Sequence, residues 1–223
     1  MSALTEKIRS RGYIAVELFP DQFVRDRIPY EQLDSILTAA RVQIGGWEFP
    51  HVGRGDEVKR ENEWYGGESQ WEHRLEACRL YQSGLFVDLR GFGWDWRDES
   101  EWWPRTEDWR PDTSVSVSDT LHRFLETYLF AANLTATAAG DEVMHLEITL
   151  GNLQTRELIV DPRRTVFAEP RTTNMQKYVV ERKYSRAELG SRARDLALEE
   201  SRLLFQRFGW QTTTERLTEL LNP

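Results

Sequence analysis

CRLYQSGLFVDLRGF (Cys78–Phe92) carries the strongest strand signal in the first half of the chain. Ser83-Gly84 interrupts it and indicates either a bend or a division into a hairpin. The segment therefore predicts a sheet, and the neighbouring sequence has to supply the remaining strands and the helices that cover it.

Further strands are predicted on both sides of this segment. Gly12–Pro20 (GYIAVELFP) alternates apolar residues on one face and stops at a proline. Val42–Val52 is extended apart from a pair of glycines. Glu57–Trp64 alternates and is polar, which indicates a half-exposed or edge strand that turns at Gly66-Gly67. Later in the chain, the expected strands are Met144–Leu150 and Arg156–Val160, as a hairpin, and Lys177–Tyr184.

Four helices are predicted from apolar residues at three- and four-residue spacing. The first begins near Pro29, a residue type suited to a first helical turn, and the second is long and capped by Ser118. Ser185 and Glu188 stand in the relation of a capping box and open the third. The last is the short segment Thr213–Leu221.

The order of these elements predicts an α+β fold, in which three to four helices pack on a mainly antiparallel sheet. A chain of 223 residues is long enough for one large domain or two small ones. We expect a single domain over residues 1–223, and the alternative is two tightly packed halves, 1–112 and 113–223.

Composition excludes several classes of protein. Hydrophobic and charged contents of 39% and 30% are typical of a soluble globular chain. No apolar run reaches bilayer length and no signal peptide is evident, so we expect a cytoplasmic protein without a membrane partner. The single cysteine, Cys78, excludes an internal disulfide framework. The formal charge of −8 argues against non-specific binding to duplex DNA.

Tryptophan is concentrated in one short segment. Five of the nine tryptophans lie within Phe92–Asp112, among seven acidic residues and three arginines. Tryptophan offers a large rigid contact area, so the segment suggests a recognition surface. Three interpretations are open: a structural lid over the sheet, an epitope for a basic protein partner, and a cage for a small ligand. The candidate partner-binding residues are Trp94, Trp96, Trp102, Trp103 and Trp109.

A second candidate surface is basic. Arginines and lysines precede the first strand, follow Val160 and recur on the strand after it. If the fold brings them together, they would bind the phosphate of a nucleotide or of a nucleic acid. The alternative is that each is solvated and paired with a nearby glutamate. The candidate phosphate-binding residues are Arg9, Arg11, Arg163, Arg164, Arg171 and Lys183.

Signatures of catalysis are weak. The chain contains no G-x-S-x-G, no P-loop, no G-x-G-x-x-G and no H-E-x-x-H. His51 follows Trp47 closely, and it is either an imidazole at a pocket wall or a turn residue stacked on a neighbouring ring. We predict no catalytic residue, no metal site and no cofactor. The remaining enzymatic alternative is a metal-dependent nuclease built from Asp56, Glu57 and Lys59, or from Asp88 with other acidic residues.

Four segments carry a resemblance: IRSRGY before the first strand, GWEFPHV, RLYQSGLFVDLRGF, and the late run ending in LLFQRFGW. Together they resemble an uncharacterised bacterial domain of hypothetical proteins, some of which carry an additional ATP-binding or regulatory module. The resemblance implies an intracellular accessory or sensor domain, with defence and regulation as candidate roles, and it transfers no catalytic residue.

These observations favour a non-enzymatic interaction or sensing module. Its contact face would be the acidic aromatic loop Gly93–Asp112, and its partner another protein within a defence or regulatory assembly. The main alternative is a sensor that binds a nucleotide or nucleic acid through the basic residues. The oligomeric state stays open.

Overall fold

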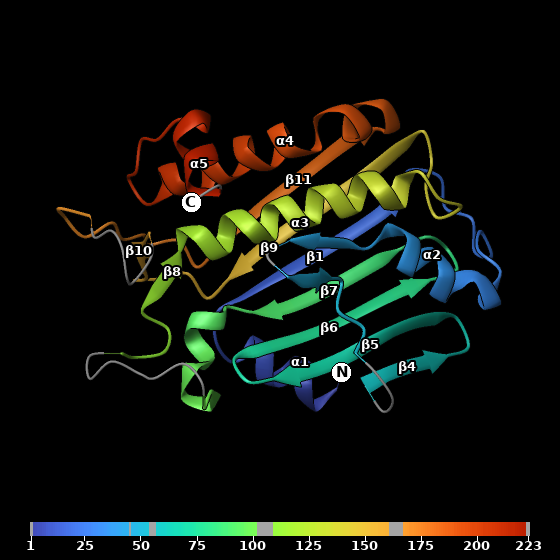
Figure 1. The fold of residues 1–223 in the computed structure, drawn as a ribbon, viewed down its shortest axis with the longest axis horizontal. Helices are drawn as coiled ribbons and strands as arrows, with labels where there is room; N and C mark the ends of the chain where they lie inside the picture. Colours follow the sequence, from blue (N-terminus) through green and yellow to red (C-terminus); the bar gives the residue numbers. More distant parts are fainter. Residues whose placement is uncertain (1, 45, 54–56, 102–108, 161–166, 222–223) are drawn as a thin grey trace.

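The computed structural model describes residues 2–44, 46–53, 57–101, 109–160 and 167–221. Within these ranges one large sheet has seven strands, all paired antiparallel, in the order β11-β9-β1-β7-β6-β5-β4 (Figure 1). The strands are β1 (Tyr13–Pro20), β4 (Val58–Glu61), β5 (Trp64–Trp71), β6 (Arg74–Tyr81), β7 (Phe86–Gly91), β9 (Val143–Gly151) and β11 (Lys177–Ser185). The predicted α+β class with a mainly antiparallel sheet is confirmed.

Strands from both ends of the chain meet at the centre of this sheet. β1 pairs with β7 on one side and with β9 on the other, with Val16 opposite both Asp88 and Ile148. Alternate residues of β1 are buried in the core, as the sequence pattern predicts.

Two long helices cover one face of the sheet. They are α3 (Val117–Thr135) and α4 (Arg186–Arg207), which lie side by side in Figure 1. The side chains of Ser116 and Ser185 cap them by accepting hydrogen bonds from the backbone N–H groups of Asp119 and Glu188. The other helices are α1 (Ala3–Arg9), α2 (Leu33–Ala40) and α5 (Thr214–Leu221).

The opposite face of the sheet is covered in part by α1. Ile8 of this helix forms a small cluster with Leu75, Leu89 and Trp96, separate from the main core. Leu75 and Leu89 alternate along β6 and β7 with residues that point toward α3, so these two strands bury side chains on both faces.

Two minor sheets complete the fold. β2 (Val42–Ile44) and β3 (Trp47–Phe49) form a short antiparallel hairpin beside α3. β8 (Ser114–Ser116) and β10 (Glu157–Ile159) form a parallel pair next to the start of α3. The prediction that Arg156–Val160 pairs with Met144–Leu150 was therefore wrong, because Glu157–Ile159 pairs with β8 instead.

The glycines resolve two expectations about turns. β6 and β7 form a hairpin at Ser83-Gly84, where Gly84 has a φ of +86°. Gly66-Gly67, however, lies inside β5 and not at a turn. A Cβ on Gly66 would stand 1.9 Å from the carbonyl oxygen of Cys78, so this glycine permits a close backbone approach.

The N-cap of α3 also differs from the expectation. It is Ser116, two residues before the predicted Ser118.

Candidate functional site

The tryptophan-rich segment packs partly against the protein. Residues Gly93–Glu99 form a 3-10 helix, in which Trp96 is 2% exposed. Trp109 is also buried, and its Nε1–H donates a 2.9 Å hydrogen bond to the carbonyl oxygen of Trp94, which is half-buried. Trp102 and Trp103 lie outside the described residues. In this conformation Trp96 and Trp109 therefore act as packing residues, and partner binding through the segment stays a prediction.

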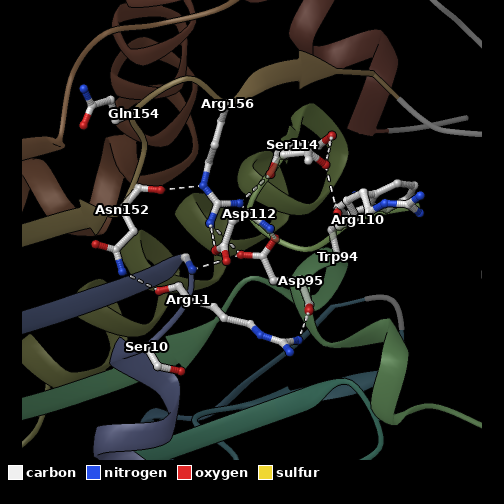
Figure 2. Close-up of polar contacts among 12 residues, drawn as sticks. Ser10, Arg11, Trp94, Asp95, Arg110, Asp112, Ser114, Asn152, Gln154 and Arg156 are labelled. Carbon is white, nitrogen blue, oxygen red and sulfur yellow. Dashed lines mark hydrogen bonds and ion pairs between the residues drawn. The ribbon is translucent and has the colours of Figure 1, made fainter. Parts of the chain in front are cut away.

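A buried ion pair anchors this segment to the rest of the fold. Arg156 and Asp95 are both 0% exposed and form two hydrogen bonds of 2.9 and 2.7 Å (Figure 2). Arg156 also contacts Asp112 at 2.6 Å, and Asp95 accepts from the backbone N–H of Gly12 at 2.9 Å. Burial raises the pKa of Asp95, and Arg156 opposes that rise. The pair and its contacts join the tryptophan-rich segment to Gly12 and to the loop that carries Arg156, which lie far apart in the sequence.

Among the described tryptophans, the most exposed lies outside this segment, at the end of β5. Trp71, at the turn between β5 and β6, is 57% exposed. Its ring stacks on Trp47 with centroids 5.6 Å apart, and His51 stacks on Trp47 at 4.8 Å. We call Trp47, His51 and Trp71 the aromatic rim. The stacking interpretation of His51 is thereby confirmed.

The aromatic rim adjoins the end of the 3-10 helix. Gln70 donates a 2.8 Å hydrogen bond to Glu99, and Ser100 donates one to Glu72. Lys7 of α1 also contacts Glu99 at 2.7 Å. Gln70 and Glu72, the residues on either side of Trp71, are therefore hydrogen-bonded to the C-terminal end of the 3-10 helix.

A cavity of about 220 Å³ opens beside the rim, between the sheet and α3. A second cavity of about 140 Å³ continues it toward the 3-10 helix, and the two share Arg74, Asp119 and Arg123. We call them together the charged cleft. The first cavity is lined by Ile44, Trp47, Arg74, Glu76, Arg90, Asp119, His122, Arg123 and Glu126, and the second adds His73, Gly93, Trp94, Arg97 and Ser116.

Ion pairs neutralise two of the arginines in the charged cleft. Arg90, 1% exposed, contacts Asp88 and Glu126, each at 2.8 Å, and its guanidinium lies 4.1 Å above the ring of Phe49. Arg123 pairs with Asp119 at 2.9 Å along α3. The charges of Arg90 and Arg123 are therefore matched by neighbouring carboxylates, as buried charges require.

Two other charged side chains of the cleft, Arg74 and Glu76, form no ion pair with a described neighbouring side chain. Among the described residues, neither Arg74 nor Glu76 has an ion pair or a side-chain hydrogen bond. Arg74 lies over the ring of Trp47 at 4.1 Å, and burial lowers its pKa. Glu76 is 6% exposed, and burial raises its pKa. They stand two residues apart on β6 and line the same cavity.

Sequence reasoning did not predict the charged cleft. One signal for it exists in β7, where Asp88 and Arg90 interrupt an apolar run on the face that points toward α3. Charged residues on a buried strand face indicate a polar network or a site. Burial raises the pKa of Asp88 to about 7, although Arg90 lowers it.

The predicted phosphate-binding residues have separate contacts. Arg9 lies 5.0 Å from the ring of Tyr13, and Arg11 pairs with Asp98 at 2.8 Å. Arg171 donates to the carbonyl oxygen of Gly209. Lys183 pairs with Asp21 at 3.0 Å, and Arg163 and Arg164 lie outside the described residues. The structure does not gather the described members into one patch, so phosphate binding stays a prediction.

The residues of the nuclease alternative are spread over the sheet. Asp56 lies outside the described residues, Glu57 precedes β4, and Lys59 is on β4. Asp88 is on β7, three strands away, and is paired with Arg90. The described residues contain no group of three or more histidine, cysteine, aspartate or glutamate side chains arranged to hold a metal ion.

None of the helices in the described part of the chain combines the length and the apolar content needed to cross a bilayer. Comparisons with protein-family models, with curated proteins and with solved structures found no match to this chain.

Proposed function

We propose that the protein is a non-enzymatic interaction module of the cytoplasm that binds another protein through the aromatic rim and the acidic surface beside it. The observation that carries this proposal is Trp71, a large aromatic side chain that is 57% exposed at the end of β5. Tryptophan is the residue type most enriched among the side chains that dominate binding energy at interfaces. Stacking on Trp47 supports its ring in this position.

The charge around the rim favours a basic partner. Residues 1–112 contain 22 of the 37 acidic side chains of the chain and 15 of its 29 basic ones. Near the rim, Glu48 pairs with Arg41 and Glu99 pairs with Lys7, so the acidic excess belongs to residues 1–112 as a whole. An acidic field speeds association with a basic surface and disfavours other acidic proteins.

Trp71→Ala tests the proposal, with Phe23→Ala as its matched control. Phe23 is 79% exposed and lies in the loop after β1, away from the rim in the sequence and in the sheet. The tagged wild-type chain and both variants are used for quantitative affinity purification from the source cell. The captured partner is then purified, and its affinity for each form is measured by biolayer interferometry.

We expect a partner whose affinity falls at least tenfold with Trp71→Ala and stays within twofold with Phe23→Ala. Its affinity should also decrease as salt concentration rises, because opposite charges meet at the interface. Equal retention by both variants, or the absence of any stoichiometric protein partner, would contradict the proposal.

A further inference from the structure

Two charged side chains of the charged cleft, Arg74 and Glu76, form no ion pair with the other described residues that line it. Arg90 and Arg123 are paired with carboxylates from β7 and α3. Arg74 and Glu76 are not, even though they project from the same face of β6 and line the same cavity. Glu76 is 6% exposed, and although Arg90 and Arg123 lower its pKa, neither bonds to its carboxylate, so a cationic ligand group could complete it.

The charges of the cleft favour a ligand that carries both signs. A dianion such as a phosphate ester would meet Arg74 but would also face the carboxylates of Glu76, Asp119 and Glu126. A simple cation would satisfy Glu76 and leave Arg74 unmatched. A zwitterion offers an opposite charge to both groups at once, and opposite charges attract more strongly in low-dielectric surroundings than in water.

The geometry suits opposite charges that lie close together. Residues i and i+2 of a strand are about 7 Å apart along the backbone, and Arg74 and Glu76 line the same cavity without forming an ion pair with each other. The planar guanidinium of Arg74 matches a carboxylate, and the carboxylate of Glu76 accepts hydrogen bonds from an ammonium group. A cavity of about 220 Å³ is smaller than drug-sized pockets of about 300–1,000 Å³ and suits a small molecule.

We propose that the charged cleft binds a free α-amino acid or a closely similar zwitterion. Arg74 holds the carboxylate and Glu76 the ammonium group. The ligand side chain lies toward Ile44, Trp47 and His122, which line the same cavity. Trp71 does not line the cavity, whereas Trp47 belongs both to the cavity and to the aromatic rim, so different variants test the two proposals.

Thermal unfolding of the full chain, followed by isothermal titration calorimetry, tests the proposal. The probes are the twenty L-amino acids, with acetate and methylammonium as ligands of a single charge. For any amino acid that binds, its N-acetyl and its carboxamide derivatives remove one charge at a time without changing the protein. We expect at least one amino acid to bind at least tenfold more tightly than acetate, methylammonium and both of its derivatives.

Variants of β6 locate the site. Arg74→Gln and Glu76→Gln should each weaken binding at least tenfold. Arg79→Gln is the matched control, because Arg79 belongs to the same strand but lines a different cavity on the other face of the sheet. Urea unfolding confirms that each variant folds. The proposal is overturned if no amino acid binds better than acetate, if the N-acetyl derivative binds as well, or if Glu76→Gln and Arg79→Gln behave alike.

Discussion

Arg156 and Asp95 form a two-pronged ion pair in which neither side chain has any exposed surface. The pair fastens the 3-10 helix of the tryptophan-rich segment to the loop that follows β9, and the N–H of Gly12 joins it from the start of β1. Burying two charges is costly, so removal of either partner leaves the other uncompensated.

Arg156→Met should therefore lower the free energy of unfolding by about 3–5 kcal/mol, measured by urea denaturation. Arg25→Met is the control, because the Arg25–Glu63 pair is exposed on both sides and should contribute about 0–1 kcal/mol. A similar loss for the two variants would show that the buried pair does not anchor the segment.

Trp96 and Trp71 should respond differently to truncation. Trp96→Ala removes a buried ring from its cluster with Ile8, Leu75 and Leu89 and should cost about 3–5 kcal/mol of stability. Trp71→Ala removes an exposed ring and should change stability by less than about 1 kcal/mol. Thermal and urea unfolding of the two variants check this, and a large loss with Trp71→Ala would mean that the rim is a packing element.

Asp88 should make stability depend on pH. Burial raises the pKa of Asp88 to about 7 in the folded protein, above its ordinary value of 3.8. Between these values the folded state holds a proton that the unfolded state releases, so the free energy of unfolding falls as pH rises from about 4 to about 7. The decrease due to Asp88 is at most about 4 kcal/mol.

Urea unfolding at pH 4, 5, 6, 7 and 8 measures this slope. Asp88→Asn should flatten it, while Asp141→Asn should not. A backbone hydrogen bond from Glu142 lowers the pKa of Asp141, so Asp141 adds stability that is lost only at still lower pH. An unchanged slope in Asp88→Asn would contradict the raised pKa.

Two glycines should have opposite effects when changed to alanine. Gly66→Ala places a Cβ against the carbonyl oxygen of Cys78, a backbone atom that cannot move aside, and should cost about 3 kcal/mol or more. Gly190 lies exposed within α4 and a Cβ there meets nothing within 4 Å. Gly190→Ala should therefore stabilise the protein by about 0.5–1 kcal/mol. Differential scanning calorimetry of both variants measures the difference, and destabilisation by Gly190→Ala would contradict this account.

Local patterns in the sequence were sufficient for the elements that depend on local chemistry. The alternation in Gly12–Pro20 corresponds to β1, and the capping relation of Ser185 and Glu188 corresponds to the first turn of α4. The Ser83-Gly84 signal corresponds to the turn of the β6–β7 hairpin. In each case the periodicity or the cap acts within a few residues, so the α+β class followed from the residue pattern alone.

Whether a given residue is core, anchor or surface depended instead on which distant segments meet in the fold. The sequence placed Trp96, and not Trp71, among the candidate partner-binding residues, yet Trp96 packs with Ile8 of α1 and Trp71 is exposed. Gly66-Gly67 resembles a turn until the backbone of β6 is placed beside it. The charged cleft depends on α3 lying over β6 and β7, which brings Glu126 to Arg90 and leaves Arg74 and Glu76 unmatched. Burial and charge pairing are properties of contacts between distant segments, and no local pattern specifies them.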